Sequence, residues 1–174
     1  MEVKEIKKKL KKSLDKQRYQ HTLGVMYTAG CLAMANGYSI EKAMLAGLLH
    51  DCAKCLSTDK KIGLEMSNPG LLHAKAGMVL AEEEYGVKDT DILHAIRVHT
   101  TGEADMGLLD KILFVADYIE PNRCEAPRLE EIRKLAFSDL DRTVAEILYD
   151  TIKFLNTKSG AIDPATSGLN YEIF

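Results

Sequence analysis

The amino-acid sequence predicts an all-α fold, one helical bundle that ends in an irregular C-terminal tail. Alanine, leucine, lysine and glutamate, which favour helices, dominate the 174 residues, and only four residues are proline. No stretch alternates apolar and polar residues between hairpin turn signals, as strands would. The chain is 46% hydrophobic and 28% charged, the balance of an ordinary globular domain. We therefore expect a single domain over residues 1–174, with its tail at 160–174.

The N-terminal half of the chain divides into expected helices at residues 2–14, 17–36, 39–54, 58–67 and 71–85. The first is rich in lysine but repeats apolar residues at helical spacing from Val3 to Leu14, so we expect an amphipathic helix packed on the domain. Gly37 marks the end of the second helix, and Ser39 offers a side-chain cap to the third. The NPG stretch at 68–70 ends the fourth.

The C-terminal half divides into expected helices at residues 89–99, 107–119, 128–137 and 139–157. Gly86 precedes the first of them and Pro121 follows the second, at points where the helical periodicity lapses. Ser138 or Asp139 can cap the last. The tail lacks helical periodicity but carries apolar residues, so we expect it to pack as an irregular segment.

The net charge and the cysteines limit which partners and which cellular compartment are expected. The net charge of −3 provides no broad basic excess, so neither nucleic acid nor an anionic membrane is expected as a partner. No segment approaches the roughly 18 uninterrupted apolar residues of a membrane span. Because no secretory signal is visible, the four cysteines are expected as free thiols in the cytoplasm. Cys52 and Cys55 form a CxxC, which we interpret as two small residues of a helix.

Titratable side chains interrupt apolar helical faces, where a charge is costly to bury unless something pairs with it. The clearest case is AGLLHDCAKC, residues 46–55, an apolar run that ends in adjacent histidine and aspartate. A single histidine on such a face is usually a core residue bonded to a backbone carbonyl, but a set needs a common explanation. The set consists of His21, His50, Asp51, His73, His99 and Asp117.

A metal ion would explain this set. If the apolar faces pack together, the six side chains converge in the bundle interior, as ligands do in helical metalloproteins. Imidazole and carboxylate suit iron, manganese, zinc or cobalt, and a cation would hold Asp51 and Asp117 ionised. Lys54, three residues after Asp51, either points into this cavity to neutralise phosphate or assist a leaving group, or is a solvated lysine at a helix end. His94 lies on another helical face and is expected to be structural.

The candidate ligands, read along the chain, resemble those of the HD superfamily of metal-dependent phosphohydrolases. The stretches with the closer likeness are RYQHTLGV, AGLLHDCAK, HAKAG, HTTG and DKILFVADYIEPNR. They resemble the YqeK family, bacterial symmetrical diadenosine tetraphosphate hydrolases, with core motifs over residues 18–123. The resemblance implies an HD-domain-like fold, iron as one or two ions, two ADP as products and a homodimer. One departure is Cys52, where the family often has an aromatic residue, at a position expected to face away from the metal.

The resemblance also implies roles for individual residues. The ligands of the principal iron would be His21, His50, Asp51 and Asp117. His73 and His99 would either complete a second metal site, with Asp51 as the bridge, or contact phosphate directly. Asp51 or a histidine of this second set could accept the proton of the attacking water.

Phosphate binding by a slightly acidic chain needs local cations. Metal ions would supply most of this charge, helped by Arg18, Lys54, Lys75 and Arg123, each of which could instead be a surface charge. No Walker loop and no GxGxxG is present, so we expect Thr100, together with Thr101 and the tail, to help grip the adenine.

Two other readings stay open at this point. One is an HD-type nucleotidase or phosphodiesterase that acts on another nucleotide through the same cluster. The other is a non-catalytic assembly module that retains a metal and docks through its basic N-terminal helix. The intact set of histidines and aspartates favours an enzyme, because a structural site needs fewer ligands and no open position.

Overall fold

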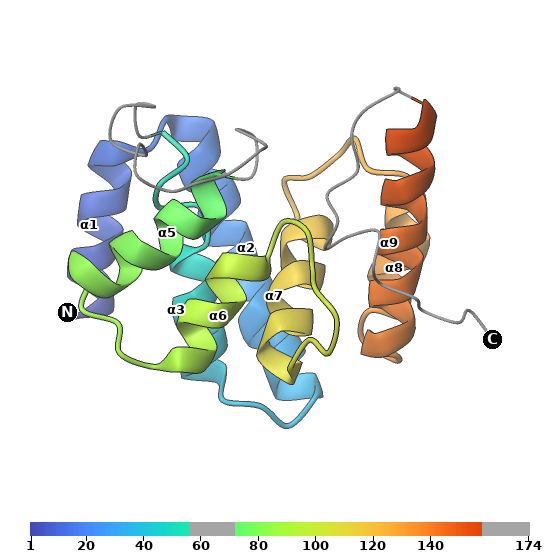
Figure 1. The fold of residues 1–174 in the computed structure, drawn as a ribbon, viewed down its shortest axis with the longest axis horizontal. Helices are drawn as coiled ribbons and strands as arrows, with labels where there is room; N and C mark the ends of the chain where they lie inside the picture. The colour runs from blue at the N-terminus through green and yellow to red at the C-terminus, as the bar shows by residue number, and fades with distance from the viewer. Residues whose placement is uncertain (56–71, 158–174) are drawn as a thin grey trace.

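The computed structural model of the chain describes residues 1–55 and 72–157, which form eight helices and no strand (Figure 1). The all-α prediction is confirmed for these residues. With the labels of Figure 1, the helices are α1 Val3–Ser13, α2 Lys16–Ala35, α3 Ile40–Leu49, α5 Leu72–Glu83, α6 Thr90–Val98, α7 Leu108–Ile119, α8 Leu129–Leu135 and α9 Leu140–Thr157. The helix expected at 58–67, the NPG stretch and the tail at 160–174 lie outside the described residues.

Most helix ends follow the predicted stop and cap residues. Gly37 and Gly86 adopt φ angles of +67° and +73°, in the left-handed region that glycine tolerates without strain. Ser39 Oγ accepts a hydrogen bond from the Lys42 backbone N–H at 3.3 Å at the start of α3. Asp139, one of the two predicted caps of α9, accepts one from the Arg142 N–H at 3.0 Å.

The prediction of a helix over 39–54 was wrong at its C-terminal end. α3 ends at Leu49, and tight turns follow, in which the N–H of Cys52 bonds the Leu49 carbonyl at 3.0 Å. The His50 ring explains the change, because its Nδ1 lies 2.8 Å from the Gly47 carbonyl, the group that would accept from Asp51 N–H if the helix continued. The CxxC cysteines therefore lie in this turn and not in a helix.

α2 is the centre of the bundle, because α1, α3 and α7 all contact it. The backbones of α2 and α3 approach each other closely, because a Cβ added to Gly47 of α3 would lie only 2.8 Å from the Cα of Met26 in α2. α6 packs against α3, α5 and α7, and α8 and α9 pack on the opposite side of α7 (Figure 1). This arrangement brings one end of α3, α6 and α7 toward the first half of α2.

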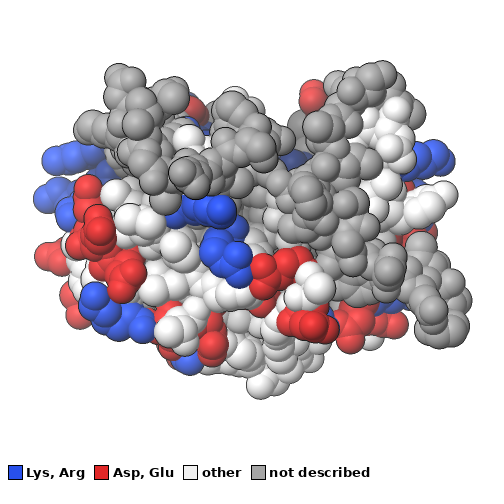
Figure 2. Space-filling model, in the orientation of Figure 1, with Lys and Arg blue, Asp and Glu red and all other residues white. Residues whose placement is uncertain are grey.

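The outer surfaces carry mixed charge. α1 rests on the core through Ile6 and Leu10, as its amphipathic pattern predicts, and its lysines stay outside. Figure 2 shows Lys and Arg mixed with Asp and Glu over the described part of one face. Over residues 1–55 and 72–157, no helix is both long enough and apolar enough to cross a membrane. All four cysteines carry free thiols, as expected.

Candidate metal centre and active site

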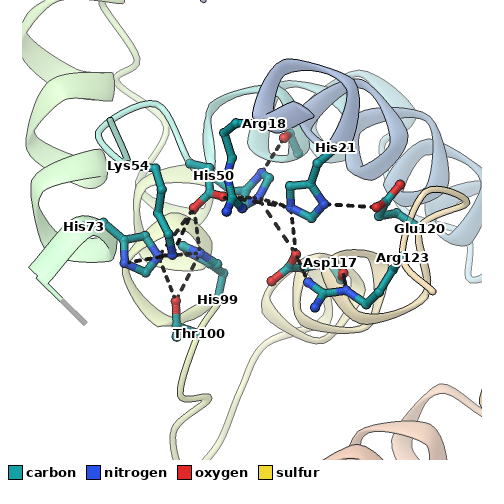
Figure 3. Close-up of polar contacts among 12 residues, drawn as sticks. Arg18, His21, His50, Lys54, His73, His99, Thr100, Asp117, Glu120 and Arg123 are labelled. Atoms are coloured by element: carbon teal, nitrogen blue, oxygen red, sulfur yellow. Dashed lines mark hydrogen bonds and ion pairs between the residues drawn. The ribbon is translucent and has the colours of Figure 1, made fainter. Parts of the chain in front are cut away.

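The six titratable side chains singled out in the sequence lie together in one cluster (Figure 3). His21 projects from α2 and Asp117 from the last turn of α7, and their Nε2 and Oδ1 atoms lie 3.1 Å apart. His50 and Asp51 follow the end of α3, His73 lies in the first turn of α5, and His99 follows α6. Residues that are up to about a hundred positions apart thus share one interior site.

Two of the imidazoles are oriented by their own helical turns. His50 Nδ1 lies 2.8 Å from the Gly47 carbonyl, and His99 Nδ1 lies 2.7 Å from the Ile96 carbonyl. Because a carbonyl only accepts, each Nδ1 carries the proton and donates it. The Nε2 atoms of both rings therefore point into the cluster, where each can bind a metal in its unprotonated state.

The cluster contains two groups of atoms that fit a metal ion. One group consists of His21, His50 and Asp117, and the other of His50, Asp51 and His99, with the ligand atoms of each group within 4.8 Å of one another. His50 belongs to both. Asp51 Oδ1 is buried and has no hydrogen-bond partner in the described part of the chain, an expensive state for a carboxylate. Nitrogen and oxygen donors around an unsatisfied buried oxygen fit a divalent cation of the iron, manganese, cobalt or zinc type.

The electrostatics keep both carboxylates ionised. Burial raises the pKa of Asp51, but the imidazoles of His50 and His99 lower it by more, so its pKa lies far below the ordinary value. Burial likewise raises the pKa of Asp117, while His21 and its neighbours lower it by more, and it too lies well below its ordinary value. Both side chains are therefore negatively charged acceptors at neutral pH.

Two arginines flank the carboxylates. Arg18 Nη1 lies 2.7 Å from Asp51 Oδ2, and Arg123 Nη2 lies 3.0 Å from Asp117 Oδ1. Arg123 also donates through Nε to the Asp117 carbonyl at 2.9 Å. Each guanidinium has five N–H donors, so both keep donors for a further anion.

Lys54, His73 and Thr100 border the other end of the cluster (Figure 3). The Lys54 Nζ lies 3.1 Å from His73 Nε2 and 3.9 Å from Asp51 Oδ1. Lys54 lies in the turn after α3, because the helix ends at Leu49. The helical spacing used to predict its position therefore does not apply, but its side chain still reaches the cluster. The Thr100 Oγ1 lies 3.2 Å from His73 Nε2 and 3.1 Å from His99 Nε2.

Comparison with known proteins agrees with this geometry. The sequence profile of the HD domain family matches residues 18–122, which include all six clustered residues. The chain belongs to the HD domain family. The resemblance predicted from the sequence is therefore confirmed at the level of the family.

Two relatives of this HD-domain chain bear the name symmetrical bis(5'-nucleosyl)-tetraphosphatase. The one from Halalkalibacterium halodurans is 44% identical over 90% of this chain and 89% of its own length. The one from Bacillus subtilis is 42% identical over the same shares. A crystal structure from Clostridium acetobutylicum, described as an HD superfamily hydrolase involved in NAD metabolism, superposes with a TM-score of 0.89 at 40% identity and covers 96% of this chain and 94% of that one.

A pocket of about 360 Å³ opens beside the cluster of this HD domain. Its wall is formed by the start of α2 and by the segment after α7, and it includes Arg18, His21 and Arg123. The volume is within the range of small-molecule sites. The two arginines share this wall with the carboxylates of Asp15, Glu120 and Glu125, so the pocket is polar and of mixed charge.

Sequence reasoning missed Glu120 as a member of the site. Its side chain is 2% exposed, and its Oε1 lies 3.1 Å from His21 Nδ1. Asn122 and Arg133 were also missed, and both hold the segment that carries Glu120. No sequence signal distinguished Glu120, because a glutamate at a helix end before a proline is usually solvated.

Other sequence predictions lie at the edge of this site or outside it. The tail expected to grip adenine lies outside the described residues, and Thr101 is partly buried next to Thr100. His94 does not join the cluster but contacts Glu103 and Asp110 instead. Cys52 turns its Sγ toward the Gly77 carbonyl, at 3.5 Å.

Proposed function

We propose that this HD-domain protein hydrolyses dinucleoside tetraphosphates and cleaves diadenosine tetraphosphate symmetrically into two ADP. The observation that carries the proposal is the pair of ligand groups that share His50 and lie beside two arginines. The relatives named as symmetrical tetraphosphatases support this choice of substrate, because their likeness extends over 90% of the chain.

The residues that would hold the metal form two sets. His21, His50 and Asp117 would hold one ion, and Asp51 and His99 would line a second position, because the single Nε2 lone pair of His50 can serve only one ion. A bound divalent cation supplies polarisation of a phosphoryl oxygen and a lowered pKa for a water molecule. The resemblance to the YqeK family supports iron as the native metal, with manganese, cobalt and zinc as alternatives.

Arg18 and Arg123 bind the phosphate chain. Their side chains are 33% and 36% exposed, so a ligand in the neighbouring pocket can reach them. Each pairs with a carboxylate of the cluster and offers its remaining N–H groups to phosphate oxygens. This charge is fixed before the reaction and neutralises the phosphoryl group as its charge shifts in the transition state.

The reaction is the attack of water on one inner phosphorus, and the bond from this phosphorus to the central bridging oxygen breaks. Lys54 neutralises the charge that develops on the departing ADP. Asp51 or His73 accepts the proton of the attacking water. Thr100 holds the His73 ring through the contact at 3.2 Å and offers its hydroxyl to phosphate.

The assembly and compartment follow from the same resemblance. It supports a homodimer of single HD-type domains that acts on free dinucleotides in the cytoplasm, without nucleic acid or membrane as a partner. Light scattering after size-exclusion chromatography tests the dimer, whose mass would be about twice the 19.3 kDa of one chain.

The decisive experiment starts with metal analysis of the full chain purified without added metal. The same sample is then given a panel of diadenosine tetraphosphate, ATP and cyclic dinucleotides, and the products are separated. We expect ADP as the sole product from the tetraphosphate. In water enriched in oxygen-18, one of every two ADP molecules should carry the label, because one water attacks per cleavage.

Other product patterns would contradict the proposal. ATP together with AMP would mean asymmetric cleavage, and turnover of another nucleotide alone would indicate a nucleotidase or phosphodiesterase. A metal-containing protein that hydrolyses none of the panel would point to the binding-module alternative.

A further inference from the structure

Glu120 is a buried carboxylate placed behind His21, on the side of the ring away from the cluster (Figure 3). Its Oε1 lies 3.1 Å from His21 Nδ1. Its Oε2 accepts two hydrogen bonds from Asn122, at 2.8 Å from the backbone N–H and 3.0 Å from Nδ2. Both oxygens are therefore occupied, and the carboxylate has one defined position.

His21 needs such a partner because of where it lies. His50 and His99 follow the ends of their helices, and each ring donates to a carbonyl of its own last turn. His21 lies inside α2, where the backbone carbonyls are already used by the helix. An acceptor for its Nδ1–H must come from another element, and Glu120, directly after α7, provides it.

The path between α2 and Glu120 is kept open by a glycine. Gly24 lies one helical turn after His21, and a Cβ added there would overlap Glu120 Oε2 and lie 3.1 Å from Asn122 Nδ2. The backbone of Gly24 has ordinary helical geometry, so conformational freedom does not explain the glycine. The glycine is explained instead by the space that the Glu120 carboxylate occupies.

Arg133 of α8 holds the segment that carries Glu120. Its Nε donates to the Ile119 carbonyl at 2.9 Å, and its Nη2 donates to the carbonyls of Glu120 and Arg123 at 2.8 and 3.0 Å. These three carbonyls lie at and beyond the end of α7, where no intrahelical donors remain. α8 thereby supports both the Glu120 carboxylate and the Arg123 guanidinium.

We propose that Glu120 is a positioning residue that fixes the tautomer and direction of the His21 imidazole, and that Gly24 provides the space this requires. The carboxylate holds the proton on Nδ1, which leaves Nε2 free to bind a cation placed among Nε2, Asp117 Oδ1 and His50 Nε2, the last two at 3.1 and 3.3 Å from Nε2. A carboxylate behind a histidine ligand also makes the ring a stronger donor to a metal. The proposal rests on the proposed metal site, but not on the identity of the nucleotide.

The test uses the full chain, stripped of metal with a chelator and labelled with nitrogen-15 in its histidine rings. In the unmodified protein, NMR should find the proton of neutral His21 on Nδ1. Glu120→Ala and Gly24→Ala should both shift His21 toward a mixture of tautomers and raise the dissociation constant for Co²⁺ about 10- to 100-fold. Glu120→Gln keeps the size of the side chain and one oxygen that can accept a hydrogen bond. Its Co²⁺ affinity should therefore fall less than that of Glu120→Ala.

Gly30→Ala is the matched control. It is the same change in the same helix, but its Cβ would meet the flexible Met44 side chain and not Glu120. It should leave the His21 tautomer and the Co²⁺ affinity unchanged. If His21 keeps its Nδ1 proton and its affinity in folded Glu120→Ala, Glu120→Gln and Gly24→Ala proteins, the proposal is wrong. These measurements use no nucleotide. Their result can therefore be interpreted even if the protein does not hydrolyse diadenosine tetraphosphate.

Discussion

The Nε2 atoms of His21 and His50 lie 3.3 Å apart, although the other nitrogen of each ring faces an acceptor. With both protons on Nδ1, neither Nε2 can donate to the other, and two lone pairs face each other at hydrogen-bond distance. Such an arrangement is stable when a cation or an added proton lies between the rings. The carboxylate of Asp117, 3.1 Å from His21 Nε2, favours positive charge at the same place.

Replacing His50 should disturb metal binding more than replacing His99. His50 belongs to both groups of ligand atoms, whereas His99 belongs to one. Because His50 Nε2 has one lone pair, we expect His50→Ala to weaken binding of the ion held with His21 and Asp117 by at least about 10- to 100-fold, the typical cost of losing even an outer partner of a ligand. His99→Ala should keep the ion held with His21 and Asp117. Elemental analysis measures the metal content of the two variants, and titration with Mn²⁺ measures their metal affinity.

His94→Gln is the control for the His50 prediction, because His94 is a histidine outside the cluster. It should retain the full metal content. Equal metal content in His50→Ala and His94→Gln would show that the two ligand groups do not hold the ion.

Replacing Lys54 by methionine should lower kcat while leaving metal content unchanged. Lys54 lies within 3.9 Å of Asp51 and 3.1 Å of His73 but belongs to neither ligand group. If its ammonium stabilises the departing ADP, its loss should lower kcat about 10²- to 10³-fold, the usual effect of removing one preorganised stabilising group. Steady-state hydrolysis of diadenosine tetraphosphate gives kcat and KM separately.

Lys42→Met is a matched control for Lys54. Lys42 is similarly exposed and also pairs with a carboxylate, but it contacts Asp89, away from the cluster. Its kcat should stay within about twofold of the unmodified protein, since a surface ion pair contributes little. A rise in KM with unchanged kcat for Lys54→Met would assign Lys54 to binding alone.

Periodicity and residue type were sufficient to predict much of this molecule. The described helices have the predicted order, with most ends within two residues, because apolar spacing, glycine stops and cap side chains act locally. The six candidate ligands were found because each places a titratable group in an otherwise apolar face. Their convergence then follows from the need to bury those faces together.

The rest depended on contacts between distant residues. The early end of α3 arises from one ring nitrogen of His50 that bonds the Gly47 carbonyl, and periodicity does not register such a bond. Glu120 sits next to a proline, where a glutamate normally reads as a solvated helix end. Arg133 lies in a strongly charged helix, and only its distances to three carbonyls set it apart from its neighbours.

A methyl group at Gly47 should destabilise the fold and separate two ligands. Its Cβ would lie 2.8 Å from Met26 Cα and 3.0 Å from Met26 N, both backbone atoms that cannot rotate away. We expect Gly47→Ala to lower the free energy of unfolding by about 1–3 kcal/mol, the cost typical of overpacking. Because the shift moves α3 from α2, the distance between His50 and His21 should grow and metal affinity should fall.

Gly30→Ala separates this backbone clash from simple crowding. Gly30 lies in the same interface of α2 and α3, but its Cβ would meet the side chain of Met44, which can change rotamer. Since alanine favours a helix over glycine by up to about 1 kcal/mol and a side chain can move where backbone cannot, this variant should lose less stability than Gly47→Ala. Urea unfolding of metal-free protein measures both variants, and equal losses would contradict the argument.

The His94 cluster should make part of the stability depend on pH. His94 Nε2 lies 2.7 Å from Glu103 Oε1, and its Nδ1 lies 3.0 Å from Asp110 Oδ1, while Arg97 Nη2, 2.8 Å from the same Nε2, opposes protonation of the ring. Burial lowers the pKa of His94, but Asp110 and Glu103 raise it by more, and the pKa lies above its ordinary value of 6.5. The folded state therefore binds this proton more tightly than the unfolded state.

The sign of the effect follows from that raised pKa. The stabilisation by protonated His94 is fully present below about pH 6.5, the unfolded value, and is lost as the pH rises through the folded value. The side chain is 37% exposed, so the contribution should be at most about 1 kcal/mol. Unfolding by urea in the presence of chelator, for the unmodified protein and His94→Gln, should give a difference that is largest near pH 6 and shrinks toward pH 9. Groups that titrate elsewhere are common to both proteins and cancel in this difference, so a gap that stays constant with pH would mean that His94 is neutral in the fold.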